Sequence, residues 1–244
     1  MLVFSTPSSQ ALGALQWAKS YGWSPGIRAA KGFSHDFSHP SDAYASVVVN
    51  RGRDALVRGN CARAGLHGEA LVKALQKGGY VLVMRHASSP REVPDKQTAN
   101  TDNSKPERQL DESGRKSAVA MGKALRDLRI PIGNVLSSPT YRALETVRLA
   151  QFGTPHTFAE LGDNGQSMQD GTPAQAAWLQ KQVARFPTAT NTIVVTHLPN
   201  IVGAFPQLAS GLADGEALIF GPDGKGQAIL VARVKIEEWP AIHF

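Results

Sequence analysis

Two apolar segments of the sequence end abruptly in basic side chains. Residues 80–90 read YVLVMRHASSP, so a run fit for a buried strand stops at Arg85 and His86. Residues 192–200 read TIVVTHLPN, and this run stops in the same way at His197. A neutral imidazole can act as a nucleophile or as a base near pH 7. Two strands that each deliver a histidine at the C-terminal end are expected to form two halves of one site.

A third basic side chain, Arg142, lies in the segment SSPTYRALETV (137–147), where a short strand gives way to a helix. The first turn of a helix exposes unpaired N–H groups and the positive end of the helix dipole, so it attracts phosphate. An arginine at this place adds a planar guanidinium that matches phosphate oxygens. Together with the two histidines, Arg142 indicates a phosphate site.

The elements that must position these side chains alternate along the chain. Strands are expected at 80–84, 133–138, 156–161, 191–197, 216–222 and 226–236, and helices at 68–79, 110–130, 138–153 and 172–186. This alternation predicts an α/β fold, a three-layer sandwich with a mostly parallel central sheet and helices on both faces. The last two strands should form a hairpin around DGKG (223–226). In such sheets, sites form at the carboxyl ends of the strands.

Local signals set the ends of the helices. Asp111 and Thr172 are expected to be N-caps. Pro139 and Gly153 are expected in the first turn and at the end of the helix that contains Arg142. The helix that follows Asp111 should bury an apolar stripe formed by Val119, Met121, Leu125 and Leu128.

The charge distribution, the cysteine count and the length of the apolar runs limit which kinds of protein the chain can be. Residues 1–68 hold seven basic and three acidic residues, and the remainder holds nineteen and seventeen. The pI of 9.6 therefore reflects mainly the N-terminal segment and gives no argument for nucleic-acid binding. Cys61 is the only cysteine, so no intrachain disulfide can form. No apolar run approaches the roughly 20 residues that cross a bilayer, so no transmembrane segment is expected.

Residues 1–66 follow neither a strand period nor a helix period. We expect them to be a disordered or non-native extension, with the catalytic domain at 67–244. A transit-type presequence, or a translation start assigned too far upstream, would each give this pattern. The compartment is left open: cytoplasmic as written, periplasmic if the N-terminus is mis-assigned.

Four blocks in fixed order carry a resemblance to a known family. They are VMRHA (83–87), R-x-L-x-x-x-G-R (108–115), SSPTYRALET (137–146) and VVTH (194–197). They resemble the histidine phosphatase superfamily, which includes the phosphoglycerate-mutase-like enzymes. The resemblance covers about residues 69–235. It implies a phosphoglycerate-mutase-like fold and a histidine acid-type phosphatase, a phosphomonoester hydrolase that needs no metal and no cofactor.

The resemblance also implies a mechanism. His86 would attack the phosphorus of a monoester and become a phosphohistidine, which water would hydrolyse. Arg85, Arg142 and His197 would surround the phosphate and stabilise charge on its equatorial oxygens. The residue types agree with this mechanism, because phosphoryl transfer depends mainly on positioning and electrostatics.

The general acid and the remaining phosphate contacts are less well defined by the motifs. In FAELGDNG (158–165), Glu160 stands at the matching place for the acid, and Asp163 is the second choice. The first block reads RHASSP instead of the mutase subgroup's RHGES, which argues against a mutase. Leu-Pro-Asn follows the second histidine in place of glycine. Ser89 and Asn200 are the expected additional substrate-binding residues.

A long polar loop is expected between the first strand and the second helix, at residues 88–110. Ser88 and Ser89 could donate to phosphate or merely begin the loop. Arg108 could link the loop to the core or contact the substrate. The basic side chains of the loop could cover the substrate or be solvated; they are Arg91, Lys96, Lys105 and Arg108.

The substrate would be a small-molecule phosphomonoester or a phosphoprotein. A phosphohistidine-protein phosphatase, a sugar- or lipopolysaccharide-phosphate phosphatase and a phosphoglycerate-type mutase are alternatives. A non-catalytic phosphate- or phosphoprotein-binding module is an alternative from another class. No metal is expected, because His86 and His197 lack a third ligand with the usual spacing. His35 and His39 lie four residues apart in a segment too rich in Pro and Ser for a helix.

Overall fold

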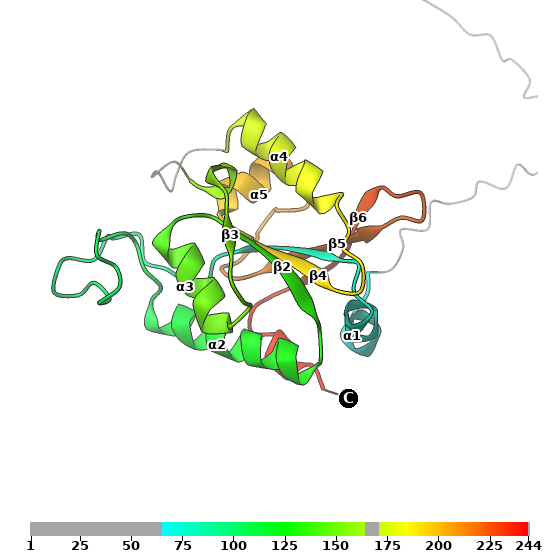
Figure 1. The fold of residues 1–244 in the computed structure, drawn as a ribbon, viewed down its shortest axis with the longest axis horizontal. Helices are drawn as coiled ribbons and strands as arrows, with labels where there is room; N and C mark the ends of the chain where they lie inside the picture. The colour runs from blue at the N-terminus through cyan, green and yellow to red at the C-terminus, as the bar shows by residue number, and fades with distance from the viewer. Residues whose placement is uncertain (1–64, 164–170, 244) are drawn as a thin grey trace, which may run out of the picture. The chain divides into compact units, whose positions relative to one another are not determined.

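The computed structural model describes residues 65–163 and 171–243 of the chain. A six-stranded sheet with the order β3-β2-β4-β1-β5-β6 lies at its centre (Figure 1). The strands are β1 (Val81–Arg85), β2 (Ile132–Ser137), β3 (His156–Thr157), β4 (Asn191–Thr196), β5 (Ala217–Pro222) and β6 (Ala228–Val234). Strands β1 to β4 pair in parallel, whereas β5 pairs antiparallel with both β1 and β6. The prediction of a mostly parallel sheet is confirmed.

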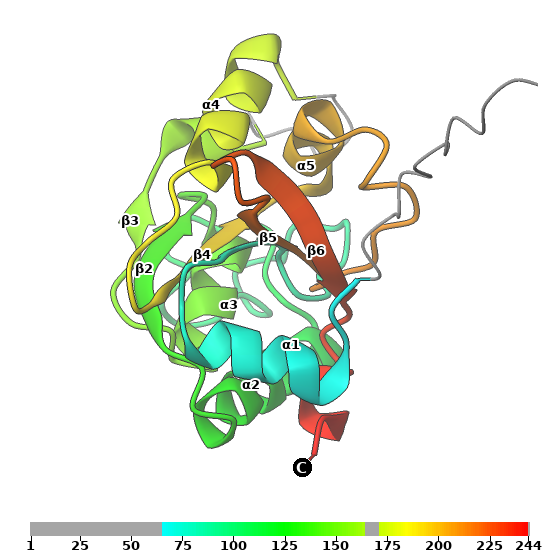
Figure 2. The ribbon, with the colours of Figure 1, turned by 90° about the vertical axis from the view of Figure 1, so that its right-hand side faces the viewer.

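Helices cover both faces of this sheet, as predicted. The helices are α1 (Gly68–Gln76), α2 (Glu112–Asp127), α3 (Tyr141–Ala150), α4 (Pro173–Val183) and α5 (Leu198–Ala204), with 3-10 turns η1 (Ala159–Leu161) and η2 (Trp239–Ala241). Figures 1 and 2 show α1, α2 and α3 on one face and α4 and α5 on the other. The fold is therefore a three-layer α/β sandwich.

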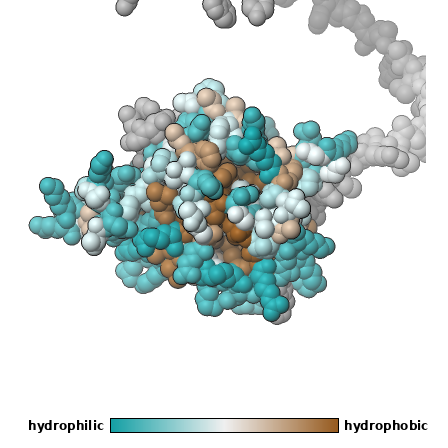
Figure 3. All heavy atoms as spheres, in the orientation of Figure 1, coloured by the Kyte–Doolittle hydropathy of each residue, from teal (hydrophilic) through white to brown (hydrophobic). Residues whose placement is uncertain are grey.

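Alternate side chains of the central strand β1 enter the two halves of the core. Leu82 and Met84 pack in the cluster that includes α1, α2 and α3. Val81 and Val83 pack in the cluster that includes α4 and α5. All four are buried, which explains why this strand is continuously apolar. On the outside, hydrophilic residues cover much of the face drawn in Figure 3, and hydrophobic residues gather at its centre, over the sheet.

The two expected N-caps are confirmed, and expectations at three other positions need correction. Asp111 accepts a hydrogen bond from the Gly114 N–H, and Thr172 forms a capping box with Gln175. Val119 is 47% exposed, so it does not belong to the buried stripe of α2. In α3 the N-cap is Thr140, so Pro139 precedes the helix instead of lying in its first turn. The left-handed residue that ends α3 is Gln151, not Gly153.

Two other sequence expectations need correction. The predicted strand at 156–161 is only two residues long, and the 3-10 turn η1 takes the rest of the segment. Helix α5 and the turn η2 were not expected. The hairpin of β5 and β6 is confirmed, and β5 also pairs with β1, with Ala217 opposite Met84.

The expectation for residues 1–66 falls almost entirely outside the described residues and stays a prediction. Leu66 is described, and its N–H donates to the Val231 carbonyl at 2.7 Å. Its side chain packs against the core, so the folded unit begins before residue 67. His35, His39 and Cys61 lie outside the described residues. In the described part of the chain, no helix is both long enough and apolar enough to cross a membrane.

Candidate active site

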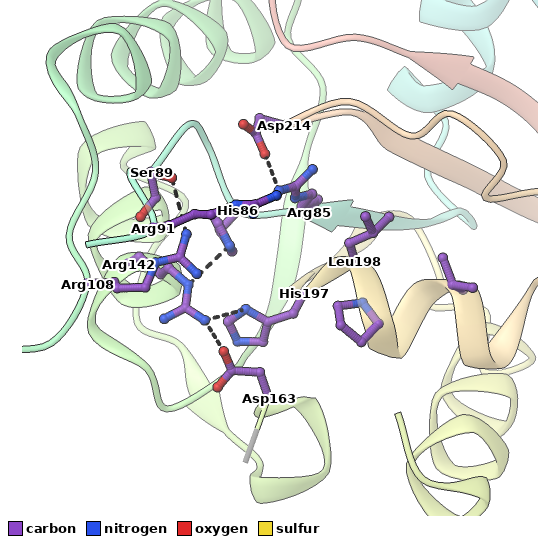
Figure 4. Close-up of a pocket in the computed structure, with 12 residues that line it drawn as sticks. Arg85, His86, Ser89, Arg91, Arg108, Arg142, Asp163, His197, Leu198 and Asp214 are labelled. Atoms are coloured by element: carbon purple, nitrogen blue, oxygen red, sulfur yellow. Dashed lines mark hydrogen bonds and ion pairs between the residues drawn. The ribbon is translucent and has the colours of Figure 1, made fainter. Parts of the chain in front are cut away.

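The parallel pairing of β1 and β4 brings the two histidines together. Arg85 is opposite Thr196 in the ladder, and the His86 N–H donates to the Thr196 carbonyl at 3.0 Å. The residues that follow each strand, His86 and His197, then lie with their ring centroids 5.2 Å apart. Arg142 reaches the same place from the start of α3 (Figure 4). These side chains line one pocket of about 470 Å³.

The hydrogen bonds of His86 define which of its ring nitrogens is free to react. Nδ1 lies 2.8 Å from the Ala87 carbonyl oxygen, which can only accept, so Nδ1 carries the proton. Nε2 then has a lone pair, and it accepts a hydrogen bond from Arg142 Nε at 3.1 Å. The side chain is 3% exposed, so its orientation is fixed by packing as well as by these bonds. Nε2 is therefore the ring nitrogen of His86 whose lone pair points into the pocket, toward Arg142.

The charge of both histidines is controlled by their surroundings. Burial lowers the pKa of His86 well below its usual value, and the nearby His197 acts in the same direction. Burial also lowers the pKa of His197 well below its usual value, with further lowering from Arg142 and Arg108. Burial and nearby guanidinium groups both disfavour the protonated, positively charged form of an imidazole. Both rings are therefore neutral at pH 7, as a nitrogen nucleophile requires.

Two hydroxyl groups hold the ring of His197. Its Nε2 lies 2.9 Å from Ser138 Oγ and 3.3 Å from Thr140 Oγ1, and its Nδ1 lies 3.1 Å from Arg142 Nη2. Because arginine only donates, Nδ1 accepts in this state and Nε2–H donates to a hydroxyl. Hydroxyl groups can also donate, so the opposite tautomer is available when the partner at Nδ1 changes. His197 can thus accept from a guanidinium or donate to an anion.

Two aspartates compensate the arginines of the pocket. Arg142 Nη2 forms an ion pair with Asp163 Oδ2, and both side chains are buried. Arg85 Nη2 lies 2.7 Å from Asp214 Oδ1 in a more exposed pair. Arg85 Nε is buried and has no hydrogen-bond acceptor among the described residues. An anion in the pocket could accept from this donor, whose burial without a partner costs about 1–3 kcal/mol.

The loop at 88–110 contributes further basic side chains to the pocket. Ser89, Arg91 and Arg108 line it, whereas Ser88 donates to the N-cap residue Asp111 at 2.6 Å. Arg108 also holds the loop, since it donates to the Pro90 carbonyl at 2.7 Å and to the Ser89 carbonyl at 3.1 Å. Arg108 thus joins two parts of the loop and also lines the pocket, and its expected contact with substrate stays a prediction. The Ser89 hydroxyl donates to the Gln109 carbonyl at 2.8 Å.

A buried carboxylate fixes this loop on α3. Glu145 accepts from the Leu110 N–H at 2.8 Å and from Asn100 Nδ2 at 2.9 Å. Tyr141 donates to Asp102 through its hydroxyl, and its own N–H donates to Glu107 at 3.0 Å. The helix that carries Arg142 thus also positions the loop that carries Arg91 and Arg108.

Two of the expected site residues do not line the pocket. Glu160 lies in η1, and its side chain does not line the pocket. The carboxylate that does line the pocket is that of Asp163, two residues after the end of η1. Asn200 is buried in α5, where its Nδ2 donates to the carbonyls of Glu160 and Gly162, each at 3.0 Å. A side chain committed to two backbone carbonyls supports the path of the chain toward Asp163. Asn200 Oδ1 is buried and has no hydrogen-bond partner among the described residues, and the expected contact of Asn200 with substrate stays a prediction.

Sequence reasoning missed Asp214 and three apolar residues of α5 that line the pocket, Leu198, Pro199 and Val202. Asp214 precedes β5, and only the antiparallel pairing of β5 with β1 brings it near Arg85. A signal for the α5 residues existed in the Leu-Pro-Asn that follows His197 in place of glycine. Within 65–163 and 171–243, no cluster of three or more His, Cys, Asp or Glu side chains could hold a metal ion.

Several solved structures are similar to the chain. One is the protein histidine phosphatase SixA in complex with tungstate, at 18% identity, with a TM-score of 0.47 and coverage of 65% of this chain and 98% of the other. Another is a putative phosphohistidine phosphatase SixA from Agrobacterium tumefaciens, at 17% identity, a TM-score of 0.46 and coverage of 64% and 98%. A phosphoserine phosphatase mutant from Entamoeba histolytica, in complex with phosphoserine, matches at 13% identity, a TM-score of 0.45 and coverage of 65% and 98%.

The comparison with curated proteins gives no match. The family model described as "Histidine phosphatase superfamily (branch 1)" matches residues 81–162. This segment contains Arg85, His86, Arg108 and Arg142, and it ends before Asp163 and His197. The match supports a phosphatase-type enzyme. The resemblance that the sequence blocks indicated is therefore confirmed: over residues 81–162 the chain matches the histidine phosphatase superfamily, branch 1.

Proposed function

We propose that the protein is a metal-independent phosphomonoester hydrolase that acts through a phosphohistidine on His86. The observation that carries this proposal is the state of the His86 ring. Its Nδ1 is tied to the Ala87 carbonyl, so the lone pair on Nε2 faces Arg142 in a basic pocket. A neutral nitrogen held beside a guanidinium is arranged for attack on a phosphorus that the same guanidinium binds.

The proposed reaction has two steps, phosphorylation of His86 and hydrolysis of the phosphohistidine. His86 Nε2 attacks phosphorus, the P–N bond forms, and the P–O bond to the alcohol breaks. Water then attacks the phosphohistidine, the P–N bond breaks, and inorganic phosphate leaves. Arg85 and Arg142 neutralise charge on the equatorial oxygens in both steps and His197 donates a hydrogen bond to one of them, because phosphoryl transfer depends mainly on such electrostatic stabilisation. His197 would donate from Nδ1 once Arg142 has turned to the phosphate.

The leaving oxygen needs a proton, and Asp163 is the proposed donor. Its carboxylate lines the pocket and forms an ion pair with Arg142. A bound phosphate dianion competes with this carboxylate for Arg142. As the proposed acid, Asp163 gives a proton to the leaving alcohol and recovers one from the attacking water.

Turnover of p-nitrophenyl phosphate in EDTA tests the proposal. Wild-type protein should hydrolyse it, His86→Ala should lose activity, and His156→Ala, which alters an exposed histidine, should keep it. Quenching in alkaline detergent with phosphorus-labelled substrate should trap a base-stable, acid-labile phosphoprotein in the wild type but not in His86→Ala. Tight binding of inorganic phosphate without any turnover would instead indicate a phosphate-binding module.

A further inference from the structure

The pocket has one wall without charge. Leu198, Pro199 and Val202 line it, and all three are half-buried. Leu198 and Val202 pack partly against the core cluster under α5, so the wall is fixed by the fold. Figure 4 shows Leu198 on the other side of His197 from Arg108 and Arg142. The pocket therefore combines basic side chains with one apolar wall that begins directly after His197.

Helix geometry explains how this wall forms immediately beside the chemistry. Helix α5 begins at Leu198, directly after His197. Residues four apart lie one above the other on a helix, so Leu198 and Val202 form a single stripe. The other side of the helix is buried, with Ile201 and Ala204 in the core. An apolar stripe that starts next to a phosphate-binding histidine lies where the ester group of a bound phosphomonoester would extend.

The charge of the pocket leaves little capacity for a second anionic group. Its lining holds four arginines and two aspartates, a surplus of two positive charges, since both histidines are neutral. The lining arginines are Arg85, Arg91, Arg108 and Arg142. One phosphate dianion balances this surplus. With Asp163 protonated as the proposed acid the surplus is three, and a second phosphate dianion would still add charge that the lining does not compensate.

A second groove adjoins the pocket and offers a competing position for the ester group. It lies between the loop and the start of α3, shares Arg108, Arg142 and Asp163 with the pocket, and is also lined by Val93 and Pro106. Val93 is 57% exposed, so its side chain is mostly in water. The α5 wall has two apolar side chains, Leu198 and Val202, that are held in place by the core, whereas Val93 projects from the loop mostly into water.

We infer that the α5 wall is the leaving-group subsite and that it binds the uncharged, apolar alcohol portion of a phosphomonoester, such as an alkyl or aryl group. This inference rests on the proposed function and deepens it by naming the substrate class. Packing of such a group on Leu198 and Val202 removes apolar area from water in the bound state. A hydrophilic alcohol of the same size cannot gain this stabilisation and loses hydration at the same wall.

The test compares substrates that differ in polarity and little in size. For wild-type protein, kcat/KM should be about 10-fold higher for n-butyl phosphate than for glycerol 3-phosphate, and should rise about 3- to 4-fold for each added methylene from methyl to butyl phosphate. Hydrolysis without any such preference would overturn the inference while leaving the proposed function intact. Absence of hydrolysis of every phosphomonoester would instead reject the proposed function.

Three variants locate the subsite. Val202→Asp should lower kcat/KM for n-butyl phosphate about 10-fold relative to methyl phosphate, and Val202→Thr should lower it by a smaller factor. Val93→Asp, in the second groove, should keep the wild-type preference. A preference that is lost in Val93→Asp and kept in both Val202 variants would place the leaving group in the second groove. Thermal unfolding checks that each variant folds; if Val202→Asp does not, Val202→Thr decides the outcome.

Discussion

Arg142 Nε lies 3.1 Å from His86 Nε2, so the guanidinium covers the lone pair that the proposed attack requires. The same guanidinium contacts Asp163 and His197 through Nη2. One side chain therefore connects the proposed nucleophile, the proposed acid and the second histidine. Attack on a bound phosphate requires this hydrogen bond to break. The phosphate would then lie between His86 Nε2 and the Arg142 guanidinium.

Replacement of Arg142 by lysine should show how much the planar guanidinium contributes. An ammonium is a point charge on a flexible stem and cannot contact all three partners at once. We expect kcat/KM for p-nitrophenyl phosphate to fall by about 10²–10³, the usual loss when one transition-state donor is removed. Arg148→Lys on the same helix is the matched control, because Arg148 is 57% exposed. Similar losses in both variants would contradict a special role for Arg142.

The proposed acid can be distinguished from its neighbour Glu160 by the leaving group. Asp163→Asn should slow hydrolysis of an alkyl phosphate by about 10²–10⁴, since an alkoxide leaves poorly without a proton. It should affect p-nitrophenyl phosphate much less, because p-nitrophenolate leaves without protonation. Glu160→Gln should behave like wild type on both substrates. The reverse pattern would restore Glu160 to the role that the sequence motif indicated.

Burial lowers the pKa values of His86 and His197, and this makes stability depend on pH. The unfolded chain, with ordinary pKa values near 6.5, binds more protons below that pH than the folded chain does. This contribution to stability is fully present above about pH 6.5 and is lost as the pH falls below it. The arginines that face the two rings, Arg85, Arg108 and Arg142, remain charged throughout this range.

Urea unfolding of the wild type should therefore give a lower free energy of unfolding at about pH 5.5 than at about pH 7.5. His86→Gln should reduce this difference, because glutamine does not titrate. His156→Gln, at an exposed position, should leave it unchanged. An equal pH dependence in all three proteins would show that buried histidines do not cause it.

The residues of the site that could be predicted from sequence, such as His86 and His197, directly follow parallel strands. Runs such as VLVM and IVVT are apolar because both faces of the sheet are covered, and their C-terminal ends necessarily lie at one edge. The glycine of the block at 108–115 also has a physical reason. A Cβ on Gly114 would lie 2.1 Å from the Ser88 carbonyl oxygen, so α2 can approach the loop after β1 only with glycine at this position.

The residues that could not be predicted depend on tertiary contacts. Helix α5 has only seven residues and contains a proline, so it depends on the burial of Ile201 rather than on local propensity. The choice between Glu160 and Asp163 depends on the path of η1, which Thr196 holds by donating to the Leu161 carbonyl at 2.8 Å. No spacing rule in the sequence reports that contact.

Asn200 allows a direct test of positioning against substrate binding. Asn200→Ala removes two hydrogen bonds to backbone carbonyls of the segment that carries Asp163, so we expect a loss of about 1–3 kcal/mol in the free energy of unfolding. Because Asn200 does not line the pocket, the inhibition constant of inorganic phosphate should stay within about two-fold of the wild-type value. Loss of a direct contact that contributes about 1.4 kcal/mol would change it about tenfold. The value of kcat for alkyl phosphates should fall as Asp163 loses its position.

Asn134→Ala, at an exposed position of β2, is the control for loss of an asparagine. Phosphate inhibition that weakens in Asn200→Ala as strongly as in Arg142→Lys would mean that the Asn200 amide contacts the anion itself.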